Sequence, residues 1–213
     1  MGTMTLTTSP RRLPSAVAAT RTGDVMGDTA RARALRRWYG SYHAELDGHH
    51  PLEDDLWFPI LAERVPTFAE DTDRIELEHH LMDDALRCVE LPFDRFVDSD
   101  ASSGAKAGAH DAAYELSSLL NVYLGFEDAD ILPQYLRRFT PEEYAEVEAQ
   151  ARRLLEVRRL PSTVPWILTA ATPAKRTHIL GSGPLALKLL WYAGRRNARL
   201  STRALGPTTQ GVA

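Results

Sequence analysis

The chain has only one cysteine, Cys88, among its 213 residues, so no disulfide can form within it. A lone cysteine is typical of a protein in a reducing compartment, and we expect a cytoplasmic location. No histidine stands one helical turn from Cys88, which favours a small packed core residue over a nucleophile. The sequence also contains no continuous apolar segment that would serve as a signal peptide or cross a bilayer.

Acidic residues are missing from the C-terminal quarter of the chain. Residues 161–213 contain seven Lys or Arg and no Asp or Glu. Because the whole chain carries −4, the residues before this segment carry −11. So mild a total charge gives no indication of a nucleic-acid partner. We expect the basic segment to pack on the acidic remainder of the chain. The alternatives are contact with an anionic membrane surface and contact with another subunit in an oligomer.

No segment has the alternating pattern of a strand, and helical periodicity dominates. Pro51 either kinks the first helix or begins a new one, and Pro66 and Pro92 are expected to end the helices before them. The sequence predicts helices over residues 29–47, 51–63, 68–91, 110–139, 141–159 and 185–200, with a loop at 98–108. We therefore predict an all-α fold: a flexible segment 1–28, an up-and-down four-helix bundle over 29–160, and a basic helical extension over 161–213.

One stretch combines residues that rarely share a helix face. His49, Glu53 and Leu56 recur at helical spacing, with Leu52 and Ile60 on the same stripe. A histidine and a carboxylate therefore lie on the face that should meet the core. Burying an unpaired carboxylate is costly, and a metal ion is the obvious compensation.

Two further helices carry ligand-type residues in their apolar stripes. His79 lies between Ile75 and Met82, and Tyr123 and Glu127 follow Leu120 at helical spacing. Helical bundles build dinuclear iron or manganese sites from such carboxylates and histidines. The alternatives are a hydrogen-bonded core histidine, a core carboxylate paired with arginine, and a tyrosine that only packs.

The motifs that carry these residues resemble the hemerythrin family, specifically the HHE cation-binding domains common in actinobacteria. The resemblance covers about residues 30–157. Its three pieces occur in the family's order and separation: His49-His50-x-x-Glu53-Asp54 before Leu56-Trp57-Phe58-Pro59, Glu78-His79 before Leu86, and Glu127-Asp128 before Ile131-Leu132-Pro133.

The resemblance implies a non-haem di-iron centre inside a four-helix bundle. By position, His49 and His79 would be terminal ligands, and Glu53 and Glu127 the bridges. Family members bind dioxygen, handle nitric oxide or peroxide, sense iron or oxygen, or oxidise a substrate. We expect two iron ions per chain and an oxidoreductase that activates dioxygen or peroxide. The alternatives are one ion or manganese, a non-catalytic oxygen, nitric oxide or iron sensor, and a degenerate site that holds another small molecule.

Two imidazoles of the family pattern are missing. No histidine precedes His43, although the family has one on its first helix. Tyr123 stands four residues before Glu127, where the family has a histidine. His50 and Asp83 are the expected partial replacements. Tyr123 would ligate ferric iron as a phenolate and is the expected catalytic residue.

Overall fold

The computed structural model describes residues 29–154 and 160–203, and within them every regular element is a helix. The predicted all-α helical bundle is therefore confirmed. The α-helices are α2 (Thr29–Leu52), α3 (Phe58–Arg64), α4 (Thr72–Asp98), α5 (Ser103–Phe126), α6 (Leu132–Arg138), α7 (Pro141–Leu154), α8 (Leu160–Ala170), α9 (Pro173–Ser182) and α10 (Leu185–Arg203). Two π-helical turns, η4 (Glu53–Trp57) and η6 (Glu127–Ile131), and a 3₁₀ turn, η5 (Pro66–Glu70), complete the list.

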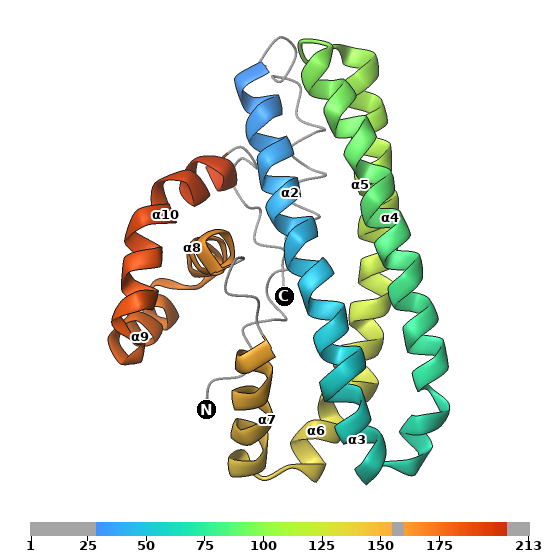
Figure 1. Ribbon diagram of the computed structural model, residues 1–213. Coiled ribbons are helices and arrows are strands. Elements are labelled where there is room, and N and C mark those ends of the chain that lie inside the picture. The colour runs from blue at the N-terminus through green and yellow to red at the C-terminus, as the bar shows by residue number, and fades with distance from the viewer. Residues whose placement is uncertain (1–28, 155–159, 204–213) are drawn as a thin grey trace.

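Three long helical rods form the body of the molecule (Figure 1). Helix α2 continues through η4 into α3, α4 returns alongside it, and α5 continues through η6 into α6. Helices α8 and α10 pack against each other and against α2, on the side away from α4 and α5. This arrangement brings both π-helical turns to the same end of the bundle.

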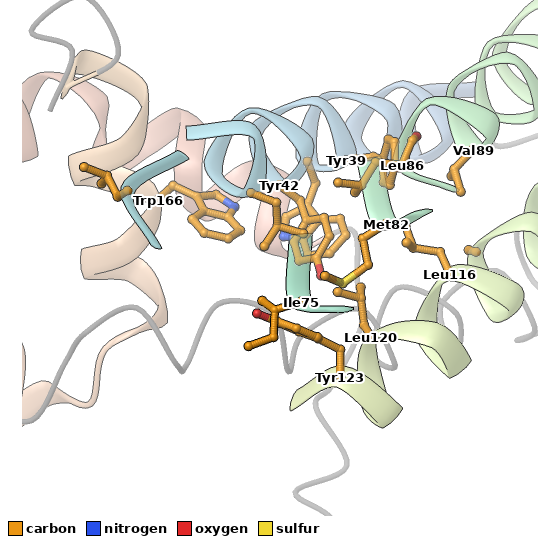
Figure 2. Close-up of a cluster of buried hydrophobic side chains, with 14 of the residues drawn as sticks. Tyr39, Tyr42, Ile75, Met82, Leu86, Val89, Leu116, Leu120, Tyr123 and Trp166 are labelled. Atoms are coloured by element: carbon orange, nitrogen blue, oxygen red, sulfur yellow. The ribbon is translucent and has the colours of Figure 1, made fainter. Parts of the chain in front are cut away.

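Aromatic and aliphatic side chains fill the space between the rods (Figure 2). Tyr39, Tyr42, Met82, Leu86 and Leu120 are all buried. The hydroxyl of Tyr39 donates to the backbone carbonyl of Leu86 over 2.6 Å, so the buried phenol is satisfied and α2 is tied to α4.

Helix α4 does not end at Pro92, as the sequence predicted, but continues to Asp98. An internal proline costs about 3 kcal/mol. The extension buries the rings of Phe93 and Phe96 completely, and Phe93 stacks on Tyr39 with ring centroids 5.1 Å apart. Burying two such rings contributes about 1.5–3 kcal/mol each, which outweighs the missing hydrogen bond.

The loop predicted at 98–108 is also wrong in its extent, because α5 begins at Ser103. The side chain of Ser102 accepts a hydrogen bond from the backbone N–H of Ala105 and caps the helix early. Pro51 begins no separate helix, since α2 runs on to Leu52 and enters the π-helical turn.

The predicted start of a helix at residue 141 is confirmed. The Thr140 hydroxyl accepts from the Glu143 N–H over 3.2 Å, and the Glu143 carboxylate accepts from the Thr140 N–H over 2.8 Å. Helix α7 is described to Leu154, so the predicted end near residue 159 lies outside the described residues. The predicted segment 1–28 lies outside them as well.

Cys88 lies on the outer surface of α4, which corrects the expectation of a core position. In the described ranges, no helix has the length and apolar composition needed to cross a bilayer.

The C-terminal helices are fastened to the bundle by apolar contacts. Trp166 of α8 meets Tyr42 edge-on, with ring centroids 6.2 Å apart, and Trp191 of α10 is buried. Gly194 allows α10 to lie directly on α8, because a Cβ at that position would overlap the ring of Pro165.

Candidate metal centre

The two bridging candidates, Glu53 and Glu127, each begin a π-helical turn. In these turns the N–H of Phe58 bonds to the carbonyl of Glu53, and the N–H of Leu132 bonds to the carbonyl of Glu127, five residues back in both cases. A proline follows each turn two residues after its end. Since a proline clashes with the carbonyl four residues before it, the wider turn accommodates that proline without breaking the rod.

The side chains of His49, Glu53 and Glu127 converge in the space between α2 and α5. One ligand-type atom from each lies within 4.8 Å of the other two. His49 Nε2 lies 3.1 Å from Glu53 Oε1, and both side chains are largely buried. The structure thus brings together three of the seven predicted ligands, one histidine and two carboxylates from separate rods.

Glu53 and His49 stabilise each other's charged forms. Burial alone would raise the pKa of Glu53, but the charge and hydrogen bond of His49, with smaller effects from His79 and His50, lower it below its ordinary value. Burial alone would lower the pKa of His49, but Glu53, Glu127 and Glu45 outweigh it and raise that pKa to about 9. At neutral pH this pair is a buried ion pair.

Glu127 is protonated at neutral pH, whereas Glu53 is ionised. Burial raises its pKa, and the adjacent carboxylate of Glu53 raises it further, to about 8, against a lowering effect of His49. Two carboxylates at this distance do not both ionise readily without a cation. At pH 7 and without metal, Glu127 therefore holds a proton that a bound cation would displace.

His79 is held between two helices by both of its ring nitrogens. Nδ1 donates to Oδ1 of Asp54 over 2.8 Å, which fixes the tautomer and leaves the lone pair on Nε2. The hydroxyl of Tyr123 donates to Nε2 over 2.5 Å, and Glu53 Oε2 lies 3.6 Å from the same atom. Burial and then the charges of Glu53 and Glu127 raise the pKa of Tyr123 far above its ordinary value, so the phenol is a neutral donor here.

His50 repeats the arrangement of His79. Its Nδ1 lies 2.8 Å from Oδ1 of Asp83, and its ring stacks on that of His79 with centroids 4.4 Å apart. Burial, together with the neighbouring His79 and His49, lowers the pKa of His50 to about 4. A neutral imidazole oriented by a carboxylate is the form that binds metals.

The structure joins all seven predicted site residues into one connected cluster. His49, Glu53 and Glu127 form its centre, His79 and Tyr123 its second side, and His50 with Asp83 its outer edge. The Asp83 carboxylate lies against the His50 ring nitrogen. Sequence reasoning did not assign Asp54, although the Glu53-Asp54 pair within the motif carried the signal for a second carboxylate beside the first.

The donor atoms of this cluster fit a cation. Among the described residues, Glu53 Oε2 and His49 Nδ1 are buried and have no hydrogen-bond partner. Native proteins rarely leave buried polar atoms unsatisfied, so such atoms point to a missing ion or water. Two carboxylates with nearby imidazoles are the donor set of non-haem iron and manganese sites.

Comparison with known proteins agrees with this geometry. A family model described as the hemerythrin HHE cation binding domain matches residues 11–135, which is more than half of the chain. No match was found among curated proteins or among solved structures. The matched range includes all seven residues of the cluster.

Proposed function

The chain belongs to the hemerythrin HHE cation-binding family, and from that premise we propose that it is a non-haem iron oxidoreductase that acts on dioxygen or peroxide. The observation that carries the proposal is the convergence of His49, Glu53 and Glu127 within 4.8 Å, with a buried and unpartnered carboxylate oxygen at its centre among the described residues.

Each residue of the cluster has a distinct task in this proposal. Glu53 and Glu127, from two different rods, would hold the iron, and His49, which now pairs with Glu53, would be a further ligand. When bound, iron supplies a Lewis acid and a one-electron redox partner for dioxygen or peroxide. The aromatic rings of Phe58 and Tyr123 pack against His79 and exclude bulk water from this side of the site.

Asp54 and Asp83 position the two imidazoles. Each carboxylate accepts the Nδ1 proton of its histidine over 2.8 Å, so each ring keeps Nε2 as its basic nitrogen. Such outer carboxylates raise the basicity of a ligating histidine. His79 and His50 are therefore prepared as ligands without any change of tautomer.

Tyr123 governs access to His79. Its hydroxyl donates to Nε2, the nitrogen that would bind metal, and it stands in the place of the family's histidine. If His79 held a metal through Nε2, this hydrogen bond would have to break, and the Tyr123 hydroxyl would then be available as a ligand or a hydrogen-bond donor at the site. This contact also favours a second function, a single-iron module that binds dioxygen or nitric oxide without turnover.

Metal analysis with turnover assays separates these functions. Protein purified aerobically and loaded with ferrous iron should hold about two irons per chain and consume peroxide catalytically. One iron per chain with reversible ligand binding and no turnover would favour the sensing module. No retained iron or manganese would contradict both functions.

Replacing Tyr123 by Phe tests the role of the hydroxyl alone, because the ring and its packing remain. We expect Tyr123→Phe to increase the iron content or affinity by releasing His79 Nε2, and to remove any visible band that comes from phenolate bound to ferric iron. An unchanged iron content and spectrum would mean that Tyr123 only packs.

A further inference from the structure

Helix α10 packs against α8 and α2 on one side, and its other side points away from the bundle (Figure 1). Trp191 on the inner face is buried, whereas Leu185, Leu189 and Tyr192 on the outer face are 70%, 61% and 59% exposed. Their spacing of four and three residues places these three side chains in one stripe along the helix. Three large apolar side chains in line on an exposed helix face need a partner.

Basic side chains border one side of this apolar stripe and its C-terminal end. Arg196 continues it by one turn and is exposed. The flank of the helix carries Lys188, Arg195 and Arg199. The guanidinium of Arg195 lies 4.6 Å from the ring centroid of Tyr192, so cationic and apolar groups share one surface. No acidic residue interrupts it, because residues 161–213 contain none.

We propose that the outer face of α10 binds the surface of an anionic phospholipid bilayer. A helix that lies in a membrane interface combines an exposed apolar stripe with Lys and Arg that contact lipid phosphates. Tyrosine is enriched at the same depth because its ring is apolar and its hydroxyl polar. Each basic residue near an anionic leaflet contributes about a fivefold gain in partitioning.

Charge distinguishes this face from the exposed apolar residues of α4. Leu77 and Leu81 of α4 are also exposed, but Glu76 and Asp84 lie beside them, and an anionic surface would repel that helix. The residues before 161 carry −11, and α10 lies on the side away from α4 and α5 (Figure 1). Helix α10 therefore lies on the side of the molecule opposite the acidic helix α4, and its outer face can meet a membrane without bringing α4 near it.

The contact surface of α10 is fixed before it meets a bilayer. Gly194 against Pro165 and the buried Trp191 hold the helix on α8. The guanidinium groups of Arg176 and Arg199 lie 5.5 and 5.6 Å from the centroid of the Trp191 ring. Binding therefore costs little conformational entropy, because the amphipathic helix is already formed.

Vesicle flotation with the full chain tests this proposal. Vesicles of phosphatidylcholine with about a third phosphatidylglycerol should float with the protein, and pure phosphatidylcholine vesicles should not. The double variant Leu189→Ser/Arg196→Glu should lower the partition coefficient by about tenfold or more, since it removes an apolar contact and reverses a charge. Salt should weaken the binding of the wild type.

The matched control is Leu136→Ser/Arg137→Glu on α6. It changes the same residue types and the same net charge on another helix, at a leucine that is 70% exposed against 61% for Leu189. We expect this control to float like the wild type, and circular dichroism should report the same helix content for both variants. Equal loss in the two double variants, or no flotation of the wild type, would overturn the proposal. So would tighter binding to an oligonucleotide of equal charge density than to the vesicles.

Discussion

Glu53 and Glu127 begin matching π-helical turns on different rods, yet their surroundings leave Glu53 ionised and Glu127 protonated. Both are followed by Asp and, six positions after the Glu, by Pro. Glu53 lies 3.1 Å from His49, and its pKa is lowered mainly by that histidine against the effect of burial. Glu127 has no such histidine four residues earlier, because Tyr123 occupies that position, and burial with the Glu53 charge raises its pKa to about 8.

The difference teaches that the backbone motif places a carboxylate, while its neighbours decide whether the carboxylate is charged. In the metal-free protein the pair holds one proton and one negative charge, which His49 balances. A cation between them would replace the proton on Glu127 and the ion pair of His49 together. We therefore expect metal uptake to release protons.

The largest expected effect comes from removing either carboxylate. Glu53→Ala and Glu127→Ala should each abolish binding of a metal pair, because each deletes a ligand common to both ions in the proposed site. Iron per chain, measured after loading and desalting, reports the loss. Near-full iron in both variants would contradict the roles assigned to these residues.

Amide substitutions should separate the two carboxylates in the metal-free state. Glu53→Gln removes the partner that keeps the buried His49 charged, and the loss of this buried ion pair should destabilise the fold by about 3 kcal/mol. Glu127→Gln replaces a protonated acid by a neutral amide of similar shape, so its cost should stay within about 1 kcal/mol. Urea unfolding of both variants measures the difference, and equal destabilisation would refute the assigned protonation states.

The orienting carboxylates should have intermediate effects. Asp54→Asn and Asp83→Asn keep the side-chain size but weaken acceptance of the Nδ1 proton of His79 and His50. Loss of such a partner lowers metal affinity by about 10–100-fold. Competition with a chelator measures the affinity. Asp84→Asn, an exposed neighbour that pairs with Arg87, is the matched control and should bind as the wild type does.

The protonation states of His49 and Glu127 should also make the stability of the metal-free protein depend on pH. The pKa of His49 rises from 6.5 to about 9, and that of Glu127 from 4.5 to about 8. Between pH 6.5 and 8 the folded state thus holds two protons that the unfolded chain has lost. Stability should fall as pH rises, by up to about 1.4 kcal/mol per pH unit for each proton.

Glu127→Gln removes one of these protons and should make the decline with pH shallower. Melting temperatures of wild type and variant across this range provide the measurement. Parallel curves would mean that Glu127 is already ionised in the folded state. The lowered pKa of Glu53 affects a different pH range. The stability that it contributes is present above pH 4.5 and is lost only in acid.

The sequence predicted the all-α bundle and the residues that gather at its centre, because helical periodicity and the spacing of His49 and Glu53 are local properties. It did not predict that α4 passes Pro92, since that depends on rings from another helix packing on Phe93. It also did not predict the π-helical turns or the contact between Asp54 and His79. Those depend on how two rods accommodate their prolines and on which side chains then meet.

An anomalous difference map from a crystal of the iron-loaded protein tests the central claim most directly. Data collected at the iron absorption edge locate iron without reference to any assumed ligand. We predict a peak enclosed by His49, Glu53 and Glu127, with a second peak on the side of His79. A map with no peak there, or with iron only on the molecular surface, would contradict the account.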